Sequence, residues 1–460
     1  MQLTSLSFII FLLTAVLFYH LLPSRFGNAV LLVFSMLFYA SLSLSSFPVI
    51  LIYLWIVYML GIAIKRSQKG ASLFTAFGII ISVALLFICR YLNRYLELSL
   101  AVPLGISYIT FRCISYLADL RSKKLISLYD PVQFLLYAMF FPKVTAGPIE
   151  RPVDFLPQLT KRPILSEEDI FTGITRISTG FVKKIAVADL LAPGVETVFS
   201  SPLSADGLSA VTASVMYSFL ILFDFSGYTD IAIGSASLFG IKLSENFDSP
   251  YTAVSVRNFW KRWHITLTKW LTGYIYIPLG GSKRGNARRL INILIVFLIS
   301  GVWHGPTLNF VVWGALHGIA QVLEILFAPL GNKIIRAIGP GKRSLIWKVP
   351  AVISTFLLVT AAWVFFRADS VESALLLFKQ MISPWAAPQV MISRCMPQIT
   401  YLYVMIPAII FSVFSDRFCR NKKGFLRTLF IAVISAWIVI LAGAVSSGTQ
   451  TGNNFIYFNF

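Results

Sequence analysis

Long apolar stretches recur from one end of the chain to the other and are separated by short polar breaks. Each of the clearest stretches can supply most of the ~20 residues that an α-helix needs to cross a lipid bilayer. They are residues 3–22, 47–64, 72–89, 209–223, 349–366, 401–414 and 425–443. They lack the strict apolar-polar alternation of a lipid-facing barrel strand. The pattern therefore predicts an all-α, polytopic integral membrane protein with about a dozen apolar helices.

The composition of the chain is that of a membrane protein. Hydrophobic residues make up 57% of the 460 positions and charged residues only 13%, whereas soluble domains carry about 25% charged residues. A water-soluble fold is therefore not expected. No internal repeat and no long Gly/Ser-rich or Pro-rich linker divides the chain. We accordingly expect one membrane domain over residues 1–460.

Basic residues exceed acidic ones by 39 to 19, which gives a formal charge of +20. They lie in short loops at residues 65–69, 121–124 and 283–289 rather than in one soluble patch, so a nucleic-acid partner is not expected. Short Lys/Arg-rich loops are typical of the cytoplasmic side, where they face anionic lipid. Some of these charges could instead meet the phosphates of a CoA donor.

The same charge pattern predicts the orientation of the N-terminus. No Lys or Arg precedes Arg25, so residues 1–22 lack the positive region of a signal peptide and are expected to remain as a helix. If the 65–69 loop is cytoplasmic, the uncharged 41–47 loop and the N-terminus lie outside. We expect a multi-pass protein of the cytoplasmic membrane.

The four cysteines indicate neither a zinc site nor a disulfide framework. They show no Cys-x-x-Cys spacing and fall at helix ends or in apolar segments. No metal site is predicted. The four positions are Cys89, Cys113, Cys395 and Cys419.

Three polar stretches interrupt the apolar pattern. Residues 141–162 contain prolines that are incompatible with a regular helix interior, and they predict a shaped loop or re-entrant segment. Residues 244–289 alternate basic and aromatic side chains, which favours a loop or interfacial segment in which an amphipathic helix places its rings in lipid. That interpretation leaves His264, at the end of the aromatic cluster, unexplained.

The third stretch places two acids, Asp224 and Asp230, inside an apolar run. Acids at membrane depth generally face a cavity or a partner. Six positions of a regular helix separate them by about 120° from alignment, so they do not form an obvious catalytic dyad. The alternative is that they bond to neighbouring helices or basic loops.

Of the four histidines, His304 has the most unusual setting. It interrupts the apolar run 290–330 between Gly301 and Gly305. If a helix enters the bilayer after Arg289, His304 lies about 22 Å along it, inside a core of about 30 Å. An ionisable residue there is a functional candidate, and the alternative is a histidine that bonds between helices.

Imidazole can take a proton from a hydroxyl that attacks a thioester. Asn309 and Trp313 follow His304 closely and could donate hydrogen bonds to a carbonyl or oxyanion. His317 is a weaker candidate, and His20 is expected to be an interface residue.

Several motifs together resemble the membrane-bound O-acyltransferase family, in particular its branch typified by the alginate O-acetyltransferase membrane subunit. The D-alanyl transfer protein of teichoic acids is a more distant relative. The motifs, in order, are Pro103-Leu104-Gly105-Ile106-Ser107-Tyr108 with Thr110, Phe111, Ser115, Tyr116 and Asp119; Ala146-Gly147-Pro148-Ile149; Phe223-Asp224-Phe225-Ser226-Gly227-Tyr228; Phe259-Trp260 with Arg262-Trp263-His264; Trp303-His304-Gly305; Trp363-Val364-Phe365-Phe366-Arg367; and Phe455-Ile456-Tyr457-Phe458.

The resemblance implies roles for particular residues. His304 corresponds to the essential catalytic histidine, and His264 to the second characteristic polar residue. The candidates for binding substrate or donor are Trp303, Asn309, Trp313, Trp260, Arg262, Trp263, Asp224, Ser226 and Tyr228. One departure is that Thr272 and Gly273 stand where the family usually has Arg-Asp, so any ion pair made there is absent.

The resemblance also implies a ring of tilted helices with a funnel from each membrane face meeting near the histidines. Acetyl-CoA would be the donor, with no permanently bound cofactor, and the acceptor would be an extracytoplasmic polysaccharide. A separate SGNH-like extracytoplasmic acetyltransferase would complete delivery. The rival hypothesis is a transporter or flippase for a lipid-linked saccharide, because transporters also use membrane acids and broken helices.

Overall fold

The computed structural model of the chain describes residues 1, 3–67, 69–92, 102–337, 348–395, 400–421 and 424–446. The described residues are predominantly helical and contain no strand, which confirms the all-α prediction. Eight helices among them are long and apolar enough to cross a membrane, and two shorter apolar helices accompany them. The terminal motif at residues 455–458 lies outside the described residues.

The helices follow one another as α1 (Leu6–Leu21), α2 (Gly27–Leu42), α3 (Phe47–Arg66), α4 (Ala71–Phe87), α6 (Ile106–Arg121), α7 (Pro131–Met139), α8 (Pro152–Phe155), α9 (Glu167–Phe181), α10 (Asp189–Phe199), α11 (Gly207–Ser237), α12 (Val256–Trp260), α13 (Ile265–Leu271), α14 (Gly285–His304), α15 (Leu308–Ala337), α16 (Lys348–Arg367), α17 (Val371–Met381), α18 (Pro388–Cys395), α19 (Thr400–Asn421) and α20 (Phe425–Ser446). A π-helical segment, Val182–Ala188, joins α9 to α10.

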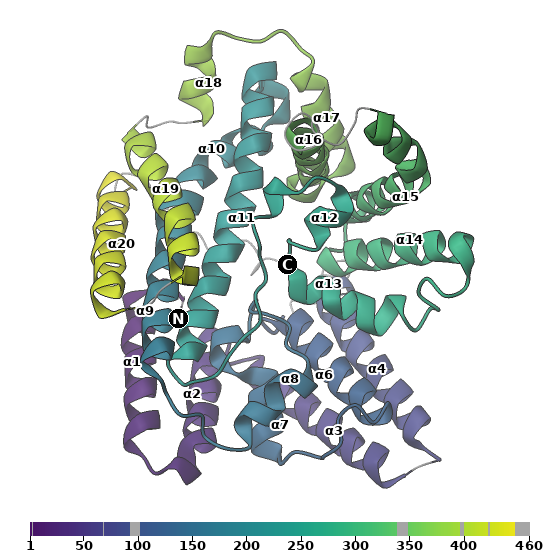
Figure 1. Cartoon of the computed structure of the whole chain (residues 1–460), viewed down its shortest axis with the longest axis vertical. Coiled ribbons are helices and arrows are strands. Elements are labelled where there is room, and N and C mark those ends of the chain that lie inside the picture. The colour runs from purple at the N-terminus through teal and green to yellow at the C-terminus, as the bar shows by residue number, and fades with distance from the viewer. Residues whose placement is uncertain are drawn as a thin grey trace.

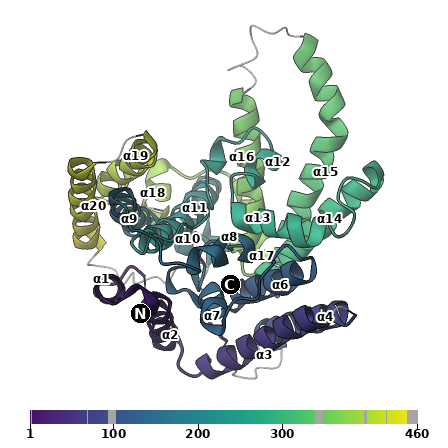
Figure 2. The ribbon, with the colours of Figure 1, turned by 60° about the horizontal axis from the view of Figure 1, so that its bottom comes forward.

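Helix α11 is the central span of the molecule. In the most apolar 18-residue stretch of α11, 67% of the residues are buried within the protein. The corresponding share is 22% in α14 and 28% in α20. Figures 1 and 2 show α1 to α4, α14 to α16, and α19 with α20 arranged around the centre that α11, α8 and α13 occupy. Outer helices present apolar side chains to lipid, which is why their sequences are apolar on all faces, whereas α11 can carry polar groups inward.

The apolar run 290–330 is broken where the sequence predicted. Helix α14 ends at His304, and α15 begins at Leu308 and packs back against α14. Gly301 permits this contact, because a Cβ there would lie 2.4 Å from the carbonyl oxygen of Phe310. The glycine therefore permits the close approach of a neighbouring backbone.

The proline-rich segment 141–162 folds into short helical turns, as expected of a shaped loop, and residues 141–150 are all buried. Arg112, itself 0% exposed, donates from Nη1 to the carbonyl of Ala138 at 2.9 Å and from Nη2 to the carbonyl of Lys143. Gly105 begins α6 with φ +74°, and a Cβ there would lie 2.6 Å from the carbonyl oxygen of Val144. A buried arginine and a close backbone contact thus fix this segment against α6.

Residues 244–289 do not form one interfacial helix, and the rings of their central aromatic cluster do not lie in lipid. The stretch is divided into a 3-10 turn (Pro250–Thr252), α12, α13, a π-helical segment (Thr272–Tyr276) and the start of α14. The rings of Phe259, Trp260 and Trp263 are buried inside the protein. Trp263 lies 5.0 Å from the ring of Trp363 on α16. Aromatic partners from other helices replace lipid as the apolar environment, a long-range effect that local periodicity does not carry.

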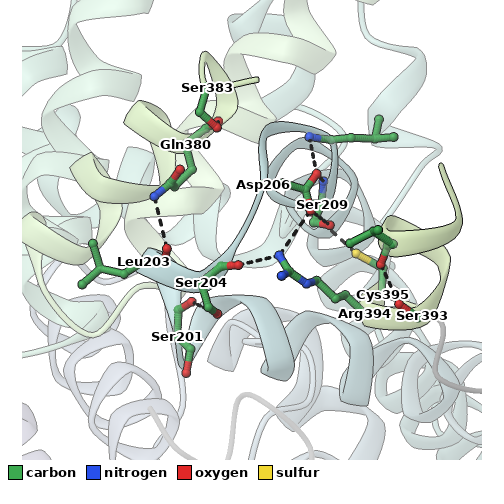
Figure 3. A network of polar contacts seen from close by, with 12 residues as sticks. Ser201, Leu203, Ser204, Asp206, Ser209, Gln380, Ser383, Ser393, Arg394 and Cys395 are labelled. Carbon is green, nitrogen blue, oxygen red and sulfur yellow. Dashed lines mark hydrogen bonds and ion pairs between the residues drawn. The ribbon is translucent and has the colours of Figure 1, made fainter. Parts of the chain in front are cut away.

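Polar contacts fix the N-terminal end of α11, and the turn before it, to α17 and α18 (Figure 3). Asp206 caps α11 by accepting hydrogen bonds from the backbone N–H of Leu208 and Ser209, each at 3.1 Å. Arg394 on α18 pairs with the same carboxylate at 3.2 Å. Gln380 on α17 donates to the carbonyl of Leu203 at 3.4 Å. The start of the helix that carries Asp224, Ser226 and Tyr228 is thereby held in place.

Candidate active site

His304 is the last residue of α14 and is 2% exposed. Arg90, at the end of the α4 span, donates to the carbonyls of Trp303 and His304, the latter at 3.2 Å. These are C-terminal carbonyls of a helix, which have no intrahelical donors and favour a nearby cation. Arg90 thus fixes the backbone that presents the imidazole. Its sequence signal, a basic residue at the end of an apolar run, is weak, and Arg90 was not among the predicted site residues.

Aromatic rings surround the His304 imidazole. The ring centroids of Trp303, Trp313 and Phe366 lie 4.5, 4.9 and 5.1 Å away. The three rings form an aromatic cage around His304 and come from α14, α15 and α16. The cage therefore requires that the three helices pack together. Such packing excludes water and fixes the ring orientation, as a catalytic base requires.

His264 lies between α12 and α13 and is 1% exposed. It adopts the left-handed conformation, with φ 41° and ψ 54°, a geometry that is costly for a residue with a Cβ and that clusters at functional sites. Burial lowers the pKa of His264 to about 3. The ring is therefore neutral near pH 7, where a neutral imidazole can accept a proton or hydrogen bond.

Tyr108 connects the two histidines in space. Its ring lies 6.3 Å from that of His264 and 5.9 Å from that of Trp303, the neighbour of His304. The structure therefore brings together His264 and His304, which are 40 positions apart in the sequence. Tyr108 stands in one of the family motifs but was not among the predicted site residues, because only the fold places α6 beside both histidines.

Three buried donors lie at this centre: the Tyr108 hydroxyl and the indole N–H groups of Trp303 and Trp313. None has a hydrogen-bond partner among the described residues. Buried polar groups nearly always have partners, so an unpartnered cluster is expected where a substrate supplies them. The two indoles lie beside His304 and the Tyr108 ring lies beside His264 and Trp303, and these positions fit donation to a carbonyl oxygen.

Asn309, by contrast, is not available as an oxyanion donor, and this expectation is wrong. Its Nδ2 donates to the carbonyls of Phe365 and Ala368, at 3.1 and 2.7 Å. Both carbonyls lie at the end of α16, so the amide caps that helix. Spacing from His304 alone could not show that the end of another helix would occupy these donors.

Trp260, Trp263 and Arg262 also have structural contacts. Trp260 donates from Nε1 to Nδ1 of His317 at 3.2 Å. Trp263 stacks on Phe259 with 5.5 Å between ring centroids. Arg262 donates to the Asp248 carbonyl and the Thr252 hydroxyl, each at 3.3 Å. These contacts fix the chain segment that precedes His264, and ligand contacts of the three residues remain a prediction.

Asp224 lies in a buried ion-pair network with Lys184. The Lys184 ammonium is 2.7 Å from Asp224 and 2.8 Å from Asp189. Asp230 pairs in the same way with Lys183 at 2.7 Å and with Arg176 at 2.6 Å. Both acids therefore join α11 to α9 and the π-helical segment that follows it. These contacts agree with the alternative interpretation, in which the two acids bond to neighbouring helices.

Ser226 and Tyr228 face different surroundings. Tyr228 bonds through its hydroxyl to Thr145 Oγ1 at 2.7 Å and accepts from the Ala146 N–H at 3.3 Å, so it fixes the 141–162 segment. Ser226 lines a cavity of about 920 Å³ between α9, α11, residues 245–252, α19 and α20. A layer of rings separates this cavity from His264: Phe247 in its wall lies 5.1 Å from Phe225, which lies 4.8 Å from His264.

The charged lining of this cavity has mixed signs. It comprises three basic residues, Arg176, Lys183 and Arg427, and four acids, Glu168, Asp230, Glu245 and Asp248. Such a balance does not favour a polyanionic ligand such as a nucleotide diphosphate. Within the described part of the chain, no cluster of three or more His, Cys, Asp or Glu side chains could hold a metal ion.

Comparison with known proteins decides the family. Residues 90–358, more than half of the chain, match the profile of the membrane-bound O-acyltransferase family. The chain belongs to this family. It is an acyltransferase and a multi-pass membrane protein, and this finding favours the enzyme over the saccharide carrier.

Individual relatives support the assignment. A peptidoglycan O-acetyltransferase of Helicobacter pylori is 34% identical, over 76% of this chain and 72% of the relative. A probable alginate O-acetylase of Azotobacter vinelandii is 32% identical, over 79% of this chain and 74% of the relative. A teichoic acid D-alanyltransferase of Bacillus subtilis is 27% identical, over 61% of this chain and 75% of the relative. The family resemblance seen in the motifs is confirmed.

Proposed function

We propose that this acyltransferase moves acetyl from cytoplasmic acetyl-CoA for O-acetylation of an extracytoplasmic polysaccharide, either alginate-like or another exopolysaccharide or cell-wall polymer. Relatives named for O-acetyl transfer match at 34% and 32% identity and a D-alanyl transferase at 27%, which supports acetyl as the acyl group. Acetyl-CoA acts as a substrate, with no resident cofactor. The whole chain, residues 1–460, acts as one membrane domain.

The observation that carries this proposal is the convergence of His304, His264 and three buried donors without partners in the described chain. His304 is the general base. It takes the proton of an acceptor hydroxyl while the hydroxyl oxygen attacks the thioester carbonyl. The indole N–H groups of Trp303 and Trp313 stabilise the oxyanion. The carbon–sulfur bond then breaks, and the proton held by His304 passes to the departing thiolate.

We further propose that loops 65–69 and 121–124 face the cytoplasm and that the N-terminus lies outside. Lys65 donates to the carbonyl of Ile126, which supports placing both basic loops on one face. Basic loops are retained on the cytoplasmic side. In intact cells, a cysteine introduced at Lys124 should resist an impermeant thiol reagent, whereas one introduced at Ser45 should react. Labelling of the first and protection of the second would reverse the assigned orientation.

The acetyl group is delivered in a relay with a second protein. The polar stretches of this chain are short, and the longest, 244–289, is folded into the membrane domain around His264. A separate SGNH-like extracytoplasmic acetyltransferase would therefore accept the group and acetylate the polymer. Dividing the transfer suits a donor and acceptor separated by an apolar layer of about 30 Å.

Reconstitution with and without the second protein tests the relay. The purified chain alone, given acetyl-CoA and polysaccharide on opposite sides of a liposome, should acetylate the polymer poorly. Adding the extracytoplasmic acetyltransferase should raise polymer acetylation at least ~10-fold. Equal acetylation in both preparations would show that the chain completes the reaction alone.

A further inference from the structure

A hydrogen-bonded chain runs from the 141–162 segment to His264. The backbone N–H of Ile149 donates to Thr266 Oγ1 at 3.0 Å, and Thr266 Oγ1 lies 2.6 Å from Asn246 Oδ1. The Thr266 N–H donates to the same oxygen at 3.2 Å, and His264 Nδ1 lies 3.3 Å from it. Asn246 is 0% exposed, as expected for a polar group with an internal function.

The direction of each hydrogen bond follows from groups that can only donate. A backbone N–H has no acceptor capacity, so the Asn246 atom facing the Thr266 N–H must be the carbonyl oxygen rather than the amide nitrogen. Because that amide oxygen can only accept, the Thr266 hydroxyl, which itself accepts from the Ile149 N–H, donates its proton to Asn246 Oδ1. These contacts determine which terminal atom of the Asn246 side chain is oxygen and which is nitrogen.

The protonation of His264 follows in turn. An amide oxygen can only accept, so His264 Nδ1 must carry the hydrogen that points to it. The ring is neutral, because burial lowers its pKa to about 3, and a neutral imidazole carries a single N–H. Its lone pair is therefore on Nε2.

We infer that Asn246 is a positioning residue that holds His264 as the Nδ1–H tautomer, so that Nε2 accepts a hydrogen bond or proton from the hydroxyl or amide of a substrate. The residue acts through His264 and does not itself meet substrate. This inference rests on the proposed function, in which His264 lies beside His304 at the site of acyl transfer, and it adds that His264 acts there through Nε2 as an acceptor.

The backbone around Asn246 also holds the strained conformation of His264. The Ile265 N–H donates to the Asn246 carbonyl at 3.0 Å, and the Asp248 N–H donates to the Arg262 carbonyl at 3.0 Å. These two bonds lie on either side of His264 along the chain. A left-handed residue other than glycine persists only when its surroundings determine it, and residues 246–248 provide that constraint.

Nitrogen-15 NMR of the full-length protein in lipid nanodiscs, labelled at histidine, tests the inference without turnover. The chain has four histidines, so loss of one signal in the His264→Gln variant assigns the resonance. Wild-type His264 should show the Nδ1–H tautomer. Asn246→Ala should give Nε2–H or a mixture, and Asn292→Ala, which removes another buried amide, should leave the His264 tautomer unchanged. A wild-type Nε2–H tautomer, or one that Asn246→Ala does not alter, would overturn the inference.

Acetyl transfer gives a second, separable readout. Asn246→Ala should lower kcat ~10-fold or more while KM for acetyl-CoA changes less, because orientation rather than donor binding is lost. Asn246→Asp keeps the acceptor oxygens and should restore part of kcat. Its carboxylate raises the pKa of His264, so its activity should decline on acidification at a higher pH than that of wild type.

A fall in kcat for Asn246→Ala with no partial rescue by Asn246→Asp would contradict a positioning role. If the tautomer result holds but His264→Ala retains full activity, the proposed role of His264 fails while the geometry stands.

Discussion

Replacing His304 with alanine should reduce acyl transfer by at least ~100-fold while the protein still inserts into the membrane. General-base catalysis contributes about 10²- to 10⁴-fold to such reactions, and alanine cannot accept the proton. The remaining cage of Trp303, Trp313 and Phe366 keeps the site closed. Ester-linked acetyl on the polymer, measured in cells with matched protein levels, reports the loss.

His317 provides a matched control, because it is a buried histidine in the same aromatic cluster. Its ring lies 5.1 Å from that of Trp313, and its Nδ1 already accepts from Trp260. His317→Ala removes the same side chain from similar packing but leaves the proposed base. Polymer acetylation should therefore fall far less than in His304→Ala. Equal losses in the two variants would assign the effect to packing rather than to proton transfer.

Lys184→Met should strongly destabilise the protein. The Lys184 ammonium lies 2.7 Å from Asp224 and 2.8 Å from Asp189, and the Asp224 side chain is 1% exposed. Removing one partner of a buried pair leaves an uncompensated charge and costs about 3–5 kcal/mol. We expect a clear fall in melting temperature, measured on purified protein in detergent.

The double variant Lys184→Met with Asp224→Asn checks this physical reason. Neutralising Asp224 removes the uncompensated charge, so part of the lost melting temperature should return. Lys269→Met, at an exposed position, should leave the melting temperature within a small margin of wild type. A double variant as unstable as the sum of its single variants would show that the pair is not coupled.

The sequence allowed prediction of those features that depend on local chemistry. Apolar runs predicted the helices, because a bilayer requires continuous apolar segments. The break at residues 300–306 was visible because Gly, His and Pro interrupt such a run, and this setting alone made His304 a candidate. The irregular 141–162 segment was visible for the same reason, through its prolines.

Contacts between distant segments could not be predicted in this way. The end of α16 takes both Asn309 donors, and Lys184 pairs with Asp224 from another helix. The rings of residues 259–263 are buried by α16 and its neighbours, not by lipid. Neither Asn246 nor Tyr108 carries a local sequence signal for this site, and their role becomes visible because the fold places both beside His264.

The most direct measurement follows labelled acetyl across a membrane. Proteoliposomes would contain the chain, with acetyl-labelled acetyl-CoA inside and the saccharide acceptor together with the extracytoplasmic acetyltransferase outside. We predict that ester-linked label appears on the saccharide as the internal thioester is consumed, and that His304→Ala abolishes both changes. Saccharide movement across the membrane without ester formation, or equal ester formation by wild type and His304→Ala, would contradict an acyltransferase that uses His304 as its base.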